Sequence, residues 1–247
     1  DVTFKWGATN EILRPVLDND QRNTGLKFSS NRMAKVIADK SKERDLLRFL
    51  VNSYKNPQIS MVFGKIFEQY VHKIFKTSNN YEMKIVTMND TSLANVKNLD
   101  SRILSFNNDT KLGKISLPNL EVKIFSSETE LVDAKVNELW IPESDKFPAI
   151  DSLAVVEGPN NTKDAFLFQV TCNLDHKLKL NALENVCNAL KAANVSNIYM
   201  VGVMPPDEFE EAKWMNIEDK QGNALKNNSM PAAMYPNQLF MKIKLIN

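Results

Sequence analysis

The segment FPAIDSLAVV (147–156), followed after the turn-rich EGPNNTKD by AFLFQVT (165–171), decides how we expect this chain to fold. Two apolar segments separated by turn residues are typical of a buried β-hairpin. Polar residues interrupt both segments, namely Asp151 in the first and Gln169 and Thr171 in the second. Burying a carboxylate or an amide without a partner costs about 2–7 kcal/mol or more. We therefore expect these side chains to have a role.

The register of the hairpin determines whether these polar groups meet. Alternation along a strand puts Asp151 on the face of Leu153, and Gln169 on the face of Thr171. A turn centred near Asn160 would set Asp151 almost opposite Gln169, whereas a one-residue slip would turn one set away from the other. A carboxylate and an amide oxygen that converge on a strand pair are half of a divalent-metal site.

The composition of the chain is that of a soluble globular protein. It has 247 residues, of which 43% are apolar and 25% charged, enough for one large domain or one domain with an appendage. Thirty-one basic and thirty acidic residues give a net charge of +1, which neither requires nor excludes nucleic acid. No apolar run reaches the roughly 20 residues needed to cross a bilayer, so we expect no membrane association. Two cysteines alone favour a reducing compartment over a disulfide framework.

The arrangement of periodic segments predicts an α/β fold. Residues 1–40 show little periodicity, and we interpret them as a linker or as the edge of an upstream domain, with residues 41–247 as the main domain. In that domain the pattern predicts helices over 41–56, 60–75 and 176–194, β-structure with long loops over 81–140, the hairpin, and strands over 197–205 and 238–246.

A third polar group of interest is Glu68, at the edge of the apolar stripe of the helix over 60–75. Its helical neighbours include Gly64 and His72. A glycine costs such a helix about 1 kcal/mol relative to alanine, and the close approach of another backbone would explain it. On the helix alone, a boundary glutamate half in water is the simpler interpretation. Together with Asp151 and Gln169, Glu68 becomes a candidate ligand.

Three motifs in this order resemble the C-terminal domain of Crinkler-type eukaryotic effectors and of the related retrotransposon-hot-spot proteins. They are G-K-x-F-E at 64–68, F-P-A-I-D-S-L at 147–153, and F-Q-V-T at 168–171 followed by His176. The resemblance covers roughly residues 45–247 and implies a divergent PD-(D/E)XK protein, with a restriction-endonuclease-like mixed sheet flanked by helices. It also implies an upstream ATPase or targeting module. No G-x-x-x-x-G-K-[ST] loop occurs in this chain, so the chain itself has no ATPase signature.

The resemblance implies a metal site and an activity. Glu68, Asp151 and Gln169 would hold Mg²⁺ or Mn²⁺, as the helical acid, the hairpin acid and the third ligand. The activity would be hydrolysis of a DNA phosphodiester by an activated water. The setting would be a secreted or translocated effector, in virulence or symbiosis, that acts in the nucleus of a host cell on DNA or on a host nuclear protein.

The chain departs from the pattern at Thr171, which stands where the family has a lysine. A hydroxyl carries no positive charge and cannot stabilise negative charge on a phosphate as an ammonium does. The nearby candidates to replace it are His176, Lys177 and Lys179, at the start of the following helix. For the lysines a solvated helix face is the alternative interpretation, and for His176 a helix cap or a surface position.

Three hypotheses about the hairpin remain open at this point. The first is a metal-dependent DNA endonuclease in which the function of the lysine has moved. The second is a catalytically inactive nuclease-fold domain that binds DNA or a host protein. The third is a satisfied polar network of Asp151 and Gln169 that only specifies the hairpin.

Overall fold

The computed structural model describes residues 13–17, 23–28, 31–77, 79–86, 104–107, 112–144, 147–158, 161–225, 230–234 and 238–245. The chain divides into two compact units. The first consists of residues 1–74 with 245–247, and the second of residues 75–244.

The first unit is a β-hairpin with three helices. Its elements are β1(Leu13–Leu17), β2(Asn23–Phe28), α2(Asn31–Lys40), α3(Glu43–Ser53), the short 3₁₀ helix η1(Pro57–Ile59) and α4(Ser60–Ile74). The helices expected over 41–56 and 60–75 are confirmed as α3 and α4. The segment that we interpreted as a linker contains β1, β2 and α2. The apolar pattern did not predict helix α2, because two of its buried residues are the small Ala34 and Ala38, which give a weak hydrophobic period.

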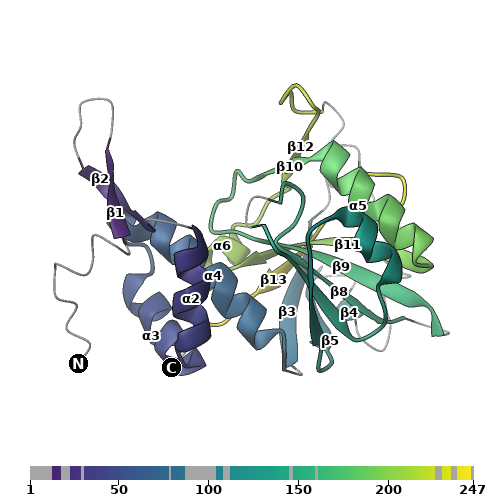
Figure 1. Ribbon diagram of the computed structural model, residues 1–247, viewed down its shortest axis with the longest axis horizontal. Coiled ribbons are helices and arrows are strands. Elements are labelled where there is room, and N and C mark those ends of the chain that lie inside the picture. The colour runs from purple at the N-terminus through teal and green to yellow at the C-terminus, as the bar shows by residue number, and fades with distance from the viewer. Residues whose placement is uncertain are drawn as a thin grey trace. The chain divides into compact units, whose positions relative to one another are not determined.

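The second unit is built on a mixed sheet of nine strands in the order β4-β5-β3-β13-β11-β9-β8-β7-β6. Figure 1 labels the strands from β4 to β8 in this order. This sheet confirms the α/β class. Its strands are β3(Asn79–Val86), β4(Leu104–Asn107), β5(Leu112–Leu117), β6(Glu121–Phe125), β7(Glu138–Pro142), β8(Ser152–Glu157), β9(Lys163–Val170), β11(Val195–Met204) and β13(Gln238–Lys242). The remaining elements are η3(Glu128–Asp133), β10(Lys177–Lys179), α5(Leu180–Ala192), α6(Pro206–Glu210) and β12(Asn216–Glu218).

The register predicted for the hairpin is confirmed. Strands β8 and β9 pair antiparallel with Ser152 opposite Phe168, and the backbone N–H of Asp151 donates to the carbonyl oxygen of Phe168 at 2.9 Å. Asp151 therefore lies directly before β8 and level with Gln169. The first strand starts later than expected, because residues 147–151 form bends rather than ladder pairs.

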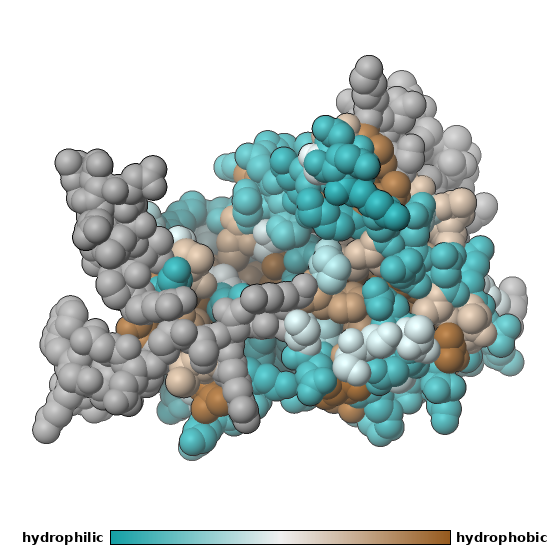
Figure 2. Space-filling model, turned by 45° about the horizontal axis from the view of Figure 1, so that its top comes forward, coloured by the Kyte–Doolittle hydropathy of each residue, from teal (hydrophilic) through white to brown (hydrophobic). Residues whose placement is uncertain are grey.

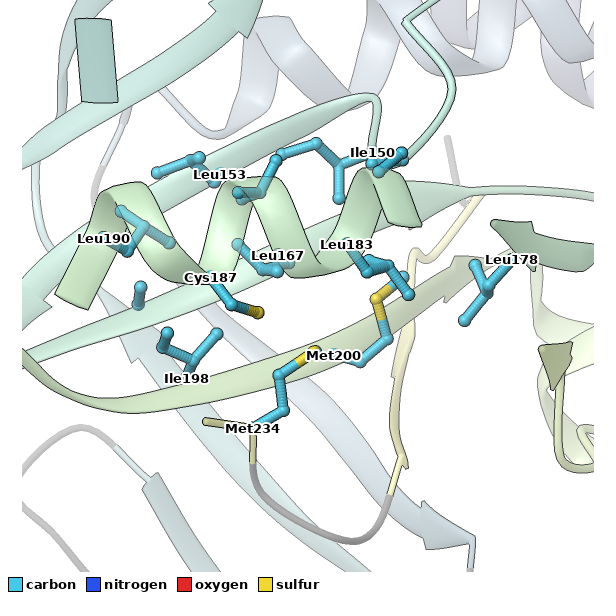
Figure 3. Packing of buried hydrophobic residues seen from close by; sticks show 14 of the residues in the cluster. Ile150, Leu153, Leu167, Leu178, Leu183, Cys187, Leu190, Ile198, Met200 and Met234 are labelled. Carbon is cyan, nitrogen blue, oxygen red and sulfur yellow. The ribbon is translucent and has the colours of Figure 1, made fainter. Parts of the chain in front are cut away.

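Helix α5 connects the parallel neighbours β9 and β11, as a crossover between parallel strands requires. Its apolar stripe, with Leu183, Cys187 and Leu190, packs on the face of the sheet that carries Leu167 and Met200 (Figure 3). All five side chains are almost wholly buried. Strands β9, β11 and β13 run parallel, so their carboxyl ends lie at one edge of the sheet. Asp151, Gln169 and Thr171 belong to this edge.

The helix expected over 176–194 begins four residues late, at Leu180. Lys177–Lys179 instead form β10, which pairs parallel with β12. The sequence did not predict β10 because its alternation covers only three residues, with Leu178 buried between two exposed lysines. An alternation this short does not distinguish a strand from a helix.

The surface in view is largely hydrophilic, with hydrophobic residues in small scattered patches (Figure 2). The large apolar side chains that are exposed among the described residues are Met61, Leu112, Ile124 and Val132. They come from four different elements. In the described part of the chain no helix is both long and apolar enough to cross a membrane.

Candidate functional site

The candidate site in the second unit is the contact between Asp151 and Gln169. The side-chain Nε2 of Gln169 donates to Oδ2 of Asp151 at 2.6 Å, and the backbone N–H of Val170 donates to the same oxygen at 2.7 Å. Gln169 is buried, and Asp151 is half-buried at the mouth of the hairpin. The structure thus brings together two of the three predicted ligands.

The orientation of the Gln169 amide differs from the expected one. We expected its oxygen to converge with the carboxylate, but its nitrogen faces Asp151, because a carboxylate can accept a hydrogen bond only from a donor. In the described part of the chain, no hydrogen bond reaches Oε1 of Gln169. The amide oxygen therefore keeps its capacity as a ligand.

The strand next to Gln169 carries a glycine at the same level. Gly202 of β11 lies opposite both Gln169 of β9 and Phe240 of β13. A Cβ built on Gly202 would come within 2.6 Å of the Phe240 ring, a distance that side chains do not tolerate. The absence of a side chain at 202 thus leaves the space that the Phe240 ring occupies beside β11.

Thr171 begins a tight turn. Its backbone N–H donates to the carbonyl oxygen of Val203 at 3.0 Å, and its Oγ1 accepts from the N–H of Asn173 at 2.9 Å. The same hydroxyl donates to the carbonyl oxygen of Asn173 at 3.3 Å. The hydroxyl therefore organises the backbone after β9, and it supplies no positive charge in place of the family's lysine.

The two residues of the turn that could act as nucleophile or base differ in protonation. Burial, with a smaller effect of the Glu208 charge, raises the pKa of the Cys172 thiol to about 12, so it is not a thiolate near neutral pH. Burial lowers the pKa of His176. A histidine whose pKa falls below its usual value of about 6.5 is neutral at pH 7 and can accept a proton.

Lys177 and Lys179 do not lie on a helix face. Both side chains bind one carboxylate: Nζ of Lys177 is 2.7 Å from Oε1 of Glu218, and Lys179 pairs with Oε2. Sequence reasoning missed Glu218. The only available signal was the alternation in Asn216–Glu218, which is too short to assign a strand by itself.

Glu68 lies on α4 of the first unit, where it is mostly buried. It accepts a hydrogen bond from Lys65 at 2.9 Å and one from Gln69 at 3.4 Å. Its role beside Asp151 stays a prediction. The explanation offered for Gly64 is wrong, because a Cβ built there would meet no heavy atom of the described chain within 4 Å.

The fit of a divalent metal to this site rests on two side chains of the second unit. Across the described residues, no group of three or more His, Cys, Asp or Glu side chains could hold a metal ion. Asp151 and Gln169 offer one carboxylate and one amide oxygen. This set suits Mg²⁺, which commonly takes one or two carboxylates and completes its shell with waters and phosphate oxygens.

Comparison of the chain with models of known families, with curated proteins and with solved structures finds no match.

Proposed function

We propose that this protein is a metal-dependent endonuclease that hydrolyses DNA phosphodiesters at the carboxyl end of β9. The observation that supports the proposal most is the Asp151–Gln169 contact, in which the glutamine leaves its Oε1 without a partner among the described residues. In open α/β sheets, ligands bind outside the carboxyl ends of the parallel strands. The candidate residues occupy that position.

Each residue has a proposed role. Asp151 and Gln169 would hold Mg²⁺ or Mn²⁺, which when bound supplies a Lewis acid for the phosphate and a water of lowered pKa; the resemblance alone gives Glu68 the role of the helical acid. Val170 fixes the carboxylate of Asp151 through its backbone N–H. His176 is the candidate proton acceptor, because its imidazole is neutral near pH 7.

The resemblance to Crinkler-type effectors extends the proposal to the setting of the reaction. We propose that the domain belongs to a secreted effector that acts in the nucleus of a host cell. The resemblance alone supports this setting, and it also supports an ATPase or targeting module upstream.

A second function has its own observation in favour. The Thr171 hydroxyl is used within its turn, and Lys177 and Lys179 are paired with Glu218. A site whose neighbouring ammonium groups are already paired with a carboxylate stabilises the charge of a reacting phosphate less well, so hydrolysis is expected to be slow. The second proposal is therefore a nuclease-fold domain that binds DNA, or a host nuclear protein, without cleaving DNA.

The test is cleavage of supercoiled plasmid with Mg²⁺ or Mn²⁺, and with EDTA as the metal-free control. Asp151→Asn keeps the shape and one acceptor oxygen but removes the charge, so it should abolish metal-dependent nicking. Glu157→Gln is the matched control, because Glu157 is an exposed carboxylate at the other end of β8. Equal nicking by wild type and Asp151→Asn would refute the endonuclease proposal, and no nicking at all with retained DNA binding would favour the second function.

A further inference from the structure

The ribbon of β10 and β12 has two different faces. Leu178 and Ile217 are level with each other and wholly buried, in the cluster that also contains the apolar side of α5. Alternation along the strands puts Lys177, Lys179 and Glu218 on the opposite face. The ribbon is therefore fixed to the core by its apolar residues and presents its charged residues together.

Glu218 holds both lysines with one carboxylate. Each of its oxygens pairs with a different ammonium, and the Glu218 side chain is only 6% exposed, whereas those of Lys177 and Lys179 are 57% and 49% exposed. Hydrogen bonds from Lys177 and then from Lys179 lower the pKa of Glu218, so the carboxylate is ionised near neutral pH. The triad has a net charge of +1.

The contacts with Glu218 leave each ammonium group with N–H donors that can still bind a second anion. An ammonium has three donors, and each lysine gives one contact to Glu218, so its half-exposed head can still donate to a second anion. A free lysine loses much rotamer entropy when it binds a ligand. A lysine already held by a buried carboxylate loses less.

The triad directly follows the candidate site along the chain. Thr171 directly follows β9. In the turn after it, the N–H of His176 donates to the carbonyl oxygen of Asn173 at 3.2 Å, and β10 begins at the next residue. The triad therefore belongs to the segment that leaves the carboxyl end of β9, where the proposed function puts a nucleic acid. Phosphate is the ligand that pairs of ammonium groups suit best in such a position.

We propose that Lys177 and Lys179 contact the phosphate backbone of a nucleic acid, and that Glu218 is a positioning residue that holds their ammonium groups for this contact. The inference rests on the proposed function in one respect, namely that nucleic acid lies at the carboxyl end of β9. It does not require cleavage.

A neighbouring ion pair provides a matched control. Lys213 pairs with Asp175 at 2.8 Å, but these side chains are 60% and 80% exposed. Neither partner is anchored by burial, so this lysine is not held as Lys177 and Lys179 are. Lys213→Gln removes one positive charge without disturbing the triad.

The test is the affinity for a fluorescent DNA duplex, measured by anisotropy in EDTA between about 50 and about 200 mM KCl. Loss of two phosphate contacts in Lys177→Gln/Lys179→Gln should weaken binding and reduce the slope of log K against log salt by about 1.8. Lys213→Gln should leave the slope unchanged. An unchanged slope in the double variant, or an equal loss in the control, would overturn the inference.

Glu218→Gln separates positioning from charge, since the two predict opposite signs. Removing a negative charge alone would tighten DNA binding, whereas releasing the lysines should weaken it, and Glu218→Asp should restore part of the affinity. Tighter or unchanged binding by Glu218→Gln would refute the positioning role. If circular dichroism shows that this variant is unfolded, the salt slope of DNA binding by Lys177→Gln/Lys179→Gln is the test of the inference.

The outcomes also separate this inference from the nuclease proposal. Wild type that binds DNA in EDTA but never cleaves it would refute the nuclease and leave the inference standing. Wild type that cleaves, with a double variant that binds as tightly, would refute the inference and leave the nuclease standing. Absence of DNA binding by wild type would contradict the inference.

Discussion

Two buried glutamines in one sheet use their amides in different ways. Gln238, at the start of β13, is fully buried; its Oε1 accepts from the backbone N–H of Met215 at 2.8 Å and its Nε2 donates to the carbonyl oxygen of Met215 at 2.9 Å. Gln169 of β9 is nearly as buried, but it donates to Asp151 and keeps its Oε1 unbonded within the described chain.

The difference separates a structural role from a functional one. A buried polar group that lacks a partner costs about 1–3 kcal/mol, so an amide with both ends paired to the backbone stabilises the fold. The Oε1 of Gln169 takes no hydrogen bond from the described chain and is not one of its fully buried unpaired atoms, so a ligand can reach it. The oxygen of Gln169 can therefore bind a metal ion, whereas both ends of the Gln238 amide are already used.

The largest expected effect is that of Gln238→Leu on stability. It leaves the N–H and the carbonyl oxygen of Met215 buried without partners, which should lower the free energy of unfolding by about 2–5 kcal/mol. Gln169→Leu leaves Asp151 its bond from Val170 and should cost at most about 1.5 kcal/mol. Urea unfolding of both variants measures the two values. Equal losses would remove the distinction between the two glutamines.

The glycine beside Gln169 should give the next largest effect. Gly202→Ala places a methyl group 2.6 Å from the Phe240 ring, and displacing this ring should cost about 1–3 kcal/mol. Gly64→Ala is the control with open space around the Cβ, and it should stabilise α4 by up to about 1 kcal/mol. Thermal unfolding of the two variants checks the signs, and a neutral Gly202→Ala would show that the Phe240 ring is not confined there.

The smallest effect concerns His176 and pH. Burial lowers its pKa in the folded state, so the unfolded chain, with a pKa of about 6.5, takes up the proton first as the pH falls. The contribution of His176 to stability should thus be full above about pH 6.5 and be lost as the pH falls below it. His176→Gln should reduce this loss. Urea midpoints at about pH 5 and pH 7 measure it, and identical pH dependence in both proteins would exclude His176 as the cause.

The sequence predicted the hairpin contact only on the assumption of a turn centred near residue 160; the observed register confirms that assumption and excludes the one-residue slip. The α3 and α4 helices followed from apolar residues spaced along one face. The orientation of the Gln169 amide could not be predicted, since the residue type is the same whichever end faces Asp151. The Glu218 triad was also out of reach, because it depends on the pairing of two three-residue strands that are distant in the chain.

The most direct test of the central claim is Mn²⁺ binding by electron paramagnetic resonance to wild type, Gln169→Leu and Gln238→Leu, each checked for folding. We predict that wild type binds Mn²⁺, that Gln169→Leu binds it at least tenfold more weakly (about 1.4 kcal/mol), and that folded Gln238→Leu binds as wild type does. Binding that is unaffected by Gln169→Leu, or absent from wild type, would contradict the assignment of Asp151 and Gln169 as a metal site.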